Sequence, residues 1–568
     1  MDAGEILLRK GLLNSSQLEQ ARALANGSGR LDQTVVELGF LKEEEALRAL
    51  GEEVGLNFVD LADADVDLTL LERFPVRFIH RESVFPVQSH NGTLTVATCD
   101  PFNLYALDEI GAATGKTILP ILASRSEIEK LIKANLGVGS QTIDGLIAQR
   151  TEEGAKVELL NQIETDGSEL SEMAQEPSVV KLVNEILFEA VQTRASDVHI
   201  ESGEDSLSVR YRIDGVLHPQ PVPPEIRGFR AAIISRLKIM AAMNIAERRL
   251  PQDGRIQVRV AGREIDIRMS VIPMIHGEGI VLRLLDKEAM EFSLAGLGMN
   301  ATIHEQFEEL IRHPHGIVLV TGPTGSGKTT TLYSALTEIR SPSTKIITTE
   351  DPVEYQLDGI SQIQVHTKIG LTFATSLRSI LRHDPDIVLV GEIRDIETAE
   401  NAIQAALTGH MVFSTLHTND AAGAYTRMAD MGVEPYLVCS TVEAVLAQRL
   451  VRTLCPHCKT LHKLDPSELP SDIPQDLLDG DVPVFEAVGC RECRNVGYRG
   501  RIGIYELMMT TNRIREIAAT KANAWDIKRI ALEEGMQTLR MDGWDKVRQG
   551  VTSVDEVIRV TKGEETLH

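Results

Sequence analysis

The chain has 568 residues, of which 43% are hydrophobic and 25% are charged, a composition typical of globular proteins. At roughly 150 residues per domain, this length predicts three or four domains. The formal net charge of −25 argues against nucleic acid as a partner, because a protein neutralises phosphates with a basic face. A local basic groove is still compatible with this charge, since net charge does not describe the distribution of charges.

The sequence predicts no membrane segment of its own. No apolar run approaches the ~20 residues that a helix needs to span a bilayer. The first residues, 1–5, lack the basic and apolar regions of a signal peptide. We therefore expect a cytoplasmic protein that reaches a membrane only through partners.

Residues 1–135 are expected to form a small α/β interaction domain. Their first part contains a weak repeat, in which residues 5–13 align with residues 33–41 and each copy carries a glycine, Gly11 or Gly39. A polar stretch suited to start a helix follows each glycine, so the repeat predicts two short helix pairs. Residues 80–135 then alternate strand-like and helix-like segments.

Acidic residues accumulate over residues 136–177, where aromatic residues are few, and this composition predicts a linker. We expect a short helix within it, near residues 156–163. Binding of a partner to the acidic run is the alternative, and a solvated linker is favoured over it.

Residues 178–297 are expected to form a compact α+β domain. An amphipathic helix over residues 179–188 is followed by strand-like segments that include residues 207–213. Asp214 and Gly215 come directly after that segment, and this dipeptide is a signal for a tight hairpin.

Residues 298–452 alternate strands and helices, which predicts a parallel sheet with helices on both faces. Within them an apolar run, residues 316–321, leads into a glycine-rich stretch and then into a helix-like segment. The stretch fits the phosphate-loop pattern and consists of Gly322, Pro323, Thr324, Gly325, Ser326, Gly327, Lys328, Thr329 and Thr330. Its backbone N–H groups would face the phosphates of a nucleoside triphosphate, Lys328 would add a positive charge, and the Thr329 hydroxyl would bind Mg²⁺. A glycine-rich surface turn is the alternative, which the flanking strand and helix disfavour.

Three further strand-like runs end in polar residues, at the place where a doubly wound sheet binds its ligands. The first runs into Glu350, Asp351 and Glu354, the second into Glu392, and the third into His417. The second has the Walker B arrangement, in which Glu392 would hold Mg²⁺ through its water shell. A helix cap or a surface turn would explain each cluster taken singly, whereas three clusters after one phosphate loop indicate a nucleotide site.

Four of the six cysteines form two C-x₂-C pairs within residues 453–505, ahead of a helical part over residues 506–568. The pairs are Cys455 with Cys458 and Cys490 with Cys493. Two such pairs supply four thiolates to one tetrahedral Zn²⁺ ion, so we predict a structural zinc site. A disulfide is disfavoured in a reducing cytoplasm. The other two, Cys99 and Cys439, end apolar stretches and are expected to be buried thiols.

Together these motifs resemble the secretion ATPases of type II secretion and type IV pilus assembly, the GspE/PilB group. The phosphate loop and residues 350–354, 384–395 and 409–419 match the Walker A, Asp box, Walker B and His box of that group, in order. The resemblance implies a RecA-like P-loop core. Assembly and secretion members of the group also carry the four-cysteine segment, whereas its shorter retraction members lack it.

Upstream of the core, residues 195–201, 210–215 and 250–255 look like the PAS-like second domain of the same group. Strong resemblance therefore covers residues 178–560. It implies an α/β protein whose RecA-like core is preceded by a PAS-like α+β domain and a small N-terminal α/β domain.

The resemblance also implies a role for each site residue of the core. Glu354 would be the catalytic carboxylate that positions the attacking water. Glu392 would serve Mg²⁺, and His417 would sense the γ-phosphate. Lys328 would bind the phosphates directly.

Two arginines of the PAS-like domain, Arg255 and Arg268, would act as arginine fingers when that domain closes on the nucleotide, and Arg283 is a weaker candidate. Arginine suits this role, because its guanidinium fork binds phosphate oxygens in a bidentate way. Ion pairing at the protein surface is the alternative for each of them.

The N-terminal repeat resembles the MshEN-like module, also described as GspE N-terminal-like, which binds cyclic di-GMP in some relatives. Arg-Leu-Gly elements would hold that ligand. Here the first copy lacks the arginine, and the second reads Arg30-Leu-Asp32, with an acid in place of glycine. Because an acid opposes a dianionic ligand, cyclic di-GMP is disfavoured at this domain, and docking to a cytoplasmic or inner-membrane protein is preferred.

We therefore predict a Mg²⁺-dependent ATPase that forms a homo-hexameric ring at the inner membrane. Hydrolysis would move an inner-membrane platform protein, which extrudes pilin or pseudopilin subunits. A DNA-translocating or DNA-processing ring ATPase is one alternative, disfavoured by the acidic balance. A regulatory protein switched by nucleotide is the other, disfavoured by the full set of carboxylates.

Overall fold

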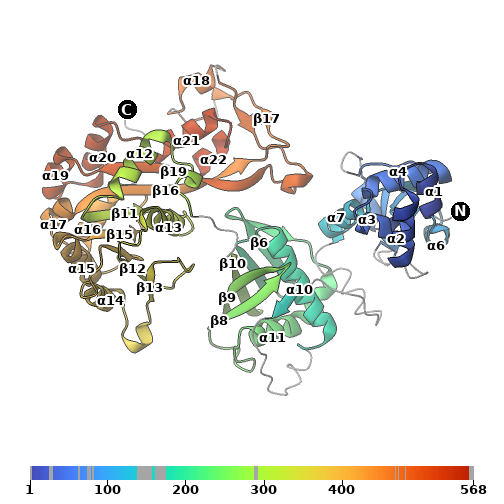
Figure 1. The fold of residues 1–568 in the computed structure, drawn as a ribbon, viewed down its shortest axis with the longest axis horizontal. Helices are drawn as coiled ribbons and strands as arrows, with labels where there is room; N and C mark the ends of the chain where they lie inside the picture. The colour runs from blue at the N-terminus through green and yellow to red at the C-terminus, as the bar shows by residue number, and fades with distance from the viewer. Residues whose placement is uncertain are drawn as a thin grey trace. The chain divides into compact units, whose positions relative to one another are not determined.

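The computed structural model describes most of the chain, in two compact units, residues 1–286 and 287–568 (Figure 1). The described residues are 3–24, 30–61, 64, 66–72, 74, 78–79, 82–136, 157–159, 174–286, 292–466, 469–470, 472–479 and 482–561.

The first unit begins with two helix pairs, as the repeat predicts. The pairs are α1 (Ala3–Arg9) with α2 (Ser15–Leu24), and α3 (Leu31–Glu37) with α4 (Glu43–Val54). Gly11 and Gly39 turn the chain between the helices of each pair with φ of 74° and 72°, in the left-handed region that glycine adopts without strain. The prediction of two helix pairs is confirmed.

A small sheet with two helices follows the helix pairs. Its elements are β1 (Val84–His90), β2 (Thr93–Thr98), α6 (Leu104–Thr114), β3 (Thr117–Leu122) and α7 (Arg125–Leu136). Strand β2 lies in the middle, antiparallel to β1 and parallel to β3. The alternation of strands and helices predicted over residues 80–135 is confirmed.

Most of the expected linker, residues 136–177, lies outside the described residues. Within it, strand β4 (Val157–Leu159) pairs with β8 of the next sheet. The prediction of a helix near residues 156–163 is therefore wrong. Val157-Glu158-Leu159 alternates apolar and polar residues with the period of a strand. Strand β8 offers an open edge, where the backbone groups of these residues find hydrogen-bond partners. The local sequence does not record this distant partner.

Residues 174–286 contribute two helices and six strands, which together with β4 form an antiparallel sheet of seven strands. These elements are α10 (Pro177–Gln192), β5 (Asp197–Ser202), β6 (Leu207–Ile213), β7 (Val216–Gln220), α11 (Arg230–Met240), β8 (Gln252–Val260), β9 (Arg263–Met274) and β10 (Gly277–Asp286). The strands lie in the order β4-β8-β9-β10-β5-β6-β7. Asp214 and Gly215 have φ of 48° and 86°, which a tight hairpin turn requires, so the predicted β6–β7 hairpin is confirmed.

The second unit is built on a sheet of seven strands in the order β13-β12-β14-β15-β11-β16-β19 (Figure 1). The strands are β11 (Gly316–Thr321), β12 (Ile346–Glu350), β13 (Ser361–Gln364), β14 (Ile387–Val390), β15 (Met411–Leu416), β16 (Val442–Leu454) and β19 (Tyr498–Met509). All neighbours pair in parallel except β16 and β19, which are antiparallel.

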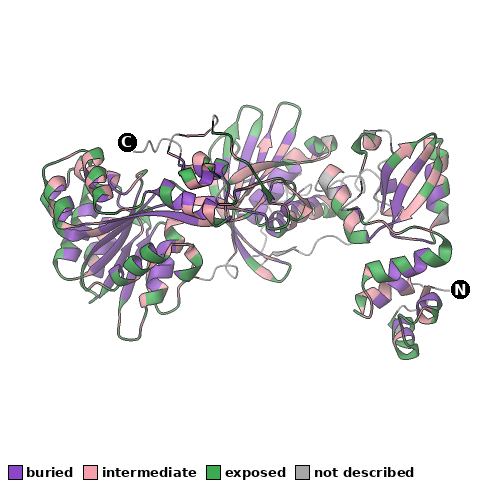
Figure 2. Ribbon diagram, turned by 90° about the horizontal axis from the view of Figure 1, so that it is seen from above, coloured by how far each residue is buried: buried purple, intermediate pink, exposed green. Residues whose placement is uncertain are grey.

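Helices cover both faces of this sheet. They include α12 (Ala301–Leu310), α13 (Lys328–Ile339), α14 (Phe373–Ile380), α15 (Ile396–Leu407), α16 (Gly423–Asp430) and α17 (Pro435–Thr441). The side chains of β11 divide between two apolar cores, with Ile317 and Leu319 in one and Val318 and Val320 in the other. Strands β11, β14 and β15 in the middle of the sheet are wholly buried, and Figure 2 shows this sheet as mainly buried. The predicted RecA-like α/β core is confirmed.

The chain after the core adds a small two-stranded sheet, the seventh strand of the core sheet and, among the described residues, five α-helices. These are β17 (Thr460–Leu461), α18 (Gln475–Leu478), β18 (Phe485–Glu486), β19, α19 (Asn512–Ala519), α20 (Ala524–Glu533), α21 (Leu539–Arg548) and α22 (Val554–Val560). Strand β19 crosses the boundary expected at residue 505 and returns to the core sheet beside β16. The cysteine segment is therefore an excursion between two neighbouring strands of one sheet.

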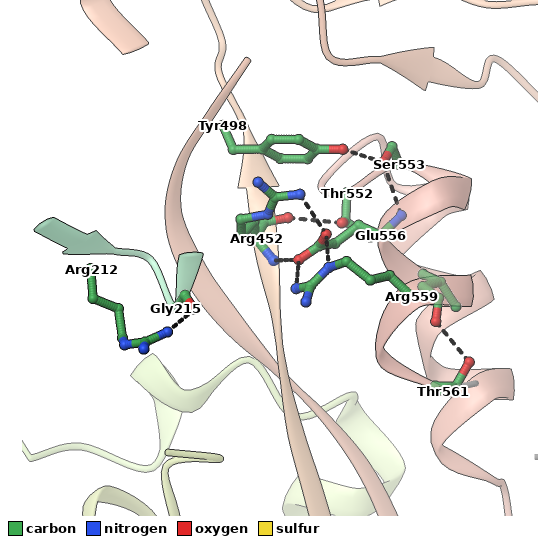
Figure 3. Close-up of polar contacts among 10 residues, drawn as sticks. Arg212, Gly215, Arg452, Tyr498, Thr552, Ser553, Glu556, Arg559 and Thr561 are labelled. Atoms are coloured by element: carbon green, nitrogen blue, oxygen red, sulfur yellow. Dashed lines mark hydrogen bonds and ion pairs between the residues drawn. The ribbon is translucent and has the colours of Figure 1, made fainter. Parts of the chain in front are cut away.

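A buried carboxylate attaches helix α22 to strand β16 (Figure 3). Glu556 is fully buried and accepts hydrogen bonds from the backbone N of Arg452 at 3.0 Å and from its Nη2 at 2.8 Å. Arg559 adds two further hydrogen bonds, at 2.8 and 2.6 Å. Burial opposes the charged form, but these donors outweigh it and lower the pKa of Glu556 to about 2.

Beside Glu556, the Arg452 guanidinium lies 3.9 Å from the centre of the Tyr498 ring, and Tyr498 shares a hydrogen bond of 2.7 Å with Ser553 (Figure 3). The close-up also draws Arg212, whose Nη1 donates to the Gly215 carbonyl at 3.0 Å and closes the β6–β7 hairpin.

We predict that Glu556→Gln loosens α22 at neutral pH. The neutral amide cannot form ion pairs with two arginines, so the free energy that holds α22 against β16 should fall by about 3 kcal/mol. Because the pKa of Glu556 is lowered, its contribution is present at neutral pH and is lost only as pH falls from the ordinary 4.5 toward 2. Hydrogen exchange of residues 539–561 should rise in this variant. Asp555→Asn, a change at the exposed neighbouring acid, is the control, and equal exchange in both variants would contradict the prediction.

Candidate functional site

The phosphate loop leaves β11 and enters α13 in a shape that only glycine allows at two positions. Gly322 and Gly327 have φ of 151° and 89°. A Cβ atom at Gly322 would lie 2.5 Å from the carbonyl oxygen of Gln448, and one at Gly327 would lie 2.8 Å from its Nε2. The loop is thus folded tightly against strand β16, with its N–H groups and the N-terminus of α13 at one end of the sheet.

Lys328 is the first residue of α13, and its side chain folds back over the loop. Its Nζ donates to the carbonyl oxygens of Gly322 at 2.8 Å and Pro323 at 3.1 Å. Burial lowers the pKa of Lys328 to about 8, with a further lowering from Arg449 and an opposing effect of Glu392. The ammonium group therefore remains mostly charged at pH 7. Thr329, in the first turn of the helix, is exposed.

Glu392 and His417 meet at the same edge of the sheet. Glu392 follows β14 and His417 follows β15, and these strands are parallel neighbours, so their carboxyl ends coincide. The Nε2 of His417 lies 3.4 Å from Oε2 of Glu392, while Nη2 of Arg394 lies 2.5 Å from Oε1. Glu392 also lies near enough to Lys328 to act on it electrostatically. Three of the predicted site residues, Lys328, Glu392 and His417, therefore form one cluster.

The two glutamates of residues 350–354 differ in surroundings. Glu350, at the end of β12, is 4% exposed and accepts hydrogen bonds from Thr348 at 2.5 Å, from Gln362 at 3.1 Å and from the Tyr333 hydroxyl. Burial and the Glu350 carboxylate raise the pKa of Tyr333, which keeps this phenol a donor. Glu354 lies beyond the strand and is only half-buried. Glu350 therefore braces α13 against the sheet.

Two polar residues at this edge were missed by the sequence interpretation. Gln448 and Arg449 lie in β16, beside the phosphate loop, and Gln448 accepts a hydrogen bond of 2.7 Å from Thr331. The sequence does contain a signal for them, because Gln448 and Arg449 are the two polar residues within the otherwise apolar run of residues 444–451. Thr321 was missed as well, and its Oγ1 accepts a hydrogen bond of 2.8 Å from the backbone N of Thr418, joining β11 to the segment after His417.

The candidate arginine fingers lie in the first unit, in one row across three neighbouring strands of its seven-stranded sheet. Arg268 on β9 is registered with Arg255 on β8 and with Arg283 on β10. Directly paired residues of neighbouring strands share a face, so the three side chains belong to the same side of the sheet. Arg255 is held by Asp266 in a bidentate ion pair, and Arg283 donates to Asp197 at 3.0 Å.

The four predicted zinc ligands converge. The Sγ distances are 3.8 Å for Cys455–Cys490, 3.7 Å for Cys458–Cys493 and 3.8 Å for Cys490–Cys493, and all four sulfurs lie within 4.8 Å of one another. Four thiolates around one Zn²⁺ lie about 3.8 Å apart when each Zn–S bond is about 2.3 Å. The cysteines therefore fit a closed tetrahedral zinc site, with no position left for a substrate.

Backbone groups prepare one of these thiols for a metal. Burial alone would raise the pKa of Cys493, but N–H groups of Cys490 at 3.1 Å and Gly497 at 3.2 Å point at its sulfur, and its pKa is lowered to about 7. The segment between the pairs packs through Ile473, Leu477 and Val484 against Trp544 and other residues of α21 and α22.

The lone cysteines are buried thiols, as predicted, and Cys99 lines a cavity of about 280 Å³ in the first unit. Arg30 also lines it, but its guanidinium is held by Asp32 at 2.6 Å and by Asp100 at 2.7 Å. The cavity further contains Glu37, Glu43 and Glu129, so its wall carries more acids than bases.

The fold and the site together define a P-loop nucleoside triphosphatase with a RecA-like core. A model of the type II/IV secretion system protein family matches residues 172–559, and a model of the MshEN domain matches residues 54–141. No helix within the described residues is long and apolar enough to cross a membrane.

Known proteins agree with this class. Type IV pilus assembly ATPase PilB of Myxococcus xanthus is 42% identical over 98% of each chain, and type II secretion system protein E of Xanthomonas campestris is 44% identical over 98% of each. The ATPase DotB of Yersinia pseudotuberculosis shares the fold, with a TM-score of 0.50 and 19% identity over 72% of this chain and 98% of its own. The chain belongs to the type II/IV secretion system protein family and is an ATPase of that family.

We predict that the purified protein holds about one zinc ion per chain and that Cys490→Ser releases it. Without the metal, hydrogen exchange should rise over residues 455–493 and over α21, because the cysteine pairs no longer hold the segment against that helix. Nucleotide binding should persist. Metal analysis with Cys439→Ser as the control checks this, and zinc retained in Cys490→Ser would contradict it.

Proposed function

We propose that this ATPase powers assembly of a pilus or pseudopilus, in type IV pilus biogenesis or type II secretion, as a homo-hexameric ring. The observation that carries the proposal is the cluster of Lys328, Glu392 and His417 at the mouth of the phosphate loop. Relatives that match the chain over 98% of its length bear the names of both machines, and this supports the kind of work that hydrolysis performs.

Within the site we assign the catalytic carboxylate to Glu354. Glu350 is buried and accepts hydrogen bonds from Thr348, Gln362 and Tyr333, so its oxygens are already engaged and are poorly placed to orient water. Glu354 is more accessible, and it would orient and deprotonate the water that attacks the γ-phosphate.

Thr329 and Glu392 would hold Mg²⁺. A hydroxyl at the start of α13 and a carboxylate at the end of β14 are the oxygen ligands that this ion takes in phosphate-loop proteins. The ion would neutralise charge on the β- and γ-phosphates. His417, in contact with Glu392, would then respond to the presence of the γ-phosphate.

Arg255 and Arg268 would supply positive charge from the first unit when it closes on a nucleotide. Their common row on one side of the sheet supports a joint role, because a row of guanidinium groups matches a chain of phosphates. Arg283 extends the row. Closure of this kind in a ring would convert hydrolysis into movement of the domains.

That movement would act on an inner-membrane platform protein, and the N-terminal domain would bind a cytoplasmic or inner-membrane docking protein, which places the ring at the inner membrane. Cyclic di-GMP is not the ligand we favour for this domain. Arg30 is already neutralised by Asp32 and Asp100, and a dianionic ligand would have to displace these carboxylates.

We predict that Glu354→Gln keeps ATP binding but loses turnover by about 10²–10⁴-fold, because only the base is removed. Glu350→Gln should instead lower thermal stability, since the amide disturbs the Tyr333 contact. Lys328→Ala, in contrast, should lose binding itself. Binding of a fluorescent ATP analogue and phosphate release measure the two effects. Near-normal hydrolysis in Glu354→Gln would move the catalytic role to Glu350 or Glu392.

We also predict that Arg268→Ala lowers turnover by roughly 10³-fold while the Kd for nucleotide changes little, because an arginine finger acts on the transition state. Arg259→Ala is the control, since Arg259 lies on β8 and pairs with Glu264 on the exposed surface. Steady-state hydrolysis by the full chain measures both. Equal rates in the two variants would assign Arg268 to surface ion pairing.

A further inference from the structure

Arg449 lies where the phosphate loop and the segment after His417 come together. Strand β16 pairs with β11 as far as Ala447 and Thr321, after which β11 turns into the loop. Arg449, two residues further along β16, therefore runs beside the loop. Its Nη1 is 3.2 Å from the place that a Cβ of Gly322 would occupy, and the residue is only 9% exposed.

The other end of the Arg449 fork holds the segment that follows β15. Its Nη2 donates to the backbone oxygen of Asn419 at 2.8 Å and to the side-chain oxygen at 3.3 Å. Its Nη1 donates to the carbonyl oxygen of Gln448 at 3.2 Å, the oxygen that packs against Gly322. One guanidinium thus connects the floor of the loop to a residue two positions after His417.

We propose that Arg449 is a positioning residue of the ATPase site, which sets the place of His417 and its partner Glu392 through Asn419. The proposal rests on the roles of His417 and Glu392 proposed above. A lysine at this position would keep the charge but could not bridge the two oxygens of Asn419, because its ammonium is a single point without a planar fork.

Two variants of the full chain test the proposal. In Arg449→Lys, we expect kcat to fall at least tenfold while the Kd for a fluorescent ATP analogue stays within about threefold, because the charge is kept and only the planar fork is lost. In Arg449→Met, which removes both the charge and the fork, kcat should fall similarly.

Arg312→Met is the matched control, since Arg312 is half exposed in the turn after α12 and pairs with surface glutamates. Thermal melting of each variant reports whether it folds, and Arg449→Lys keeps the test valid if Arg449→Met is unstable. Turnover of Arg449→Lys within threefold of wild type would overturn the proposal. So would turnover within threefold of wild type in a folded Arg449→Met.

His417→Ala and Glu392→Gln, assayed in parallel, keep this inference distinct from the proposed function. If both of these variants hydrolyse ATP normally, the proposed site itself fails, and Arg449 has nothing to position. If both lose turnover while Arg449→Lys does not, only the role of Arg449 is wrong.

Discussion

The parallel pairing of β11 with β15 on one side and β16 on the other is the constraint on which the site depends. Parallel neighbours end at the same edge of a sheet, so the phosphate loop, His417 and Arg449 are brought together although they are far apart in sequence. Strand β14, next to β15, adds Glu392. Because both faces of the sheet are buried at its centre, β11 and β14 are almost wholly apolar, and the charged groups of the site lie where strands end or pass the loop.

This arrangement explains which parts of the site could be predicted from the sequence. The phosphate loop, Glu392 and His417 each follow an apolar run, so the sequence shows where these strands end. Parallel pairing of the strands then brings their ends to one edge of the sheet. The cysteine spacing was equally informative, since two C-x₂-C pairs have few uses other than a shared metal ion. The helix pairs with Gly11 and Gly39 depend on local backbone preference, which sequence also records.

Long-range pairing accounts for what the sequence did not reveal. Strand β4 forms because β8 offers it an edge, and β19 returns to β16 across the whole cysteine segment, and neither partner is encoded locally. The bracing role of Glu350 was not predicted for the same reason. It depends on Tyr333 of helix α13 and Gln362 of strand β13, which are distant in the sequence.

Strand β19 and helix α20, in the C-terminal part of the chain, contact the segment that follows His417 and so help to hold it in place. Glu506 on β19 is fully buried and accepts a hydrogen bond of 2.8 Å from the backbone N of Ala421, just after the segment that Arg449 holds. Burial raises the pKa of Glu506, while Lys528 of α20, 3.5 Å away, favours its charged form and also approaches Asp420. The segment after His417 is therefore fixed from β16 at one end and from β19 and α20 at the other. With the role proposed for His417, its response to the γ-phosphate would act on these contacts and, through them, on β19 and α20.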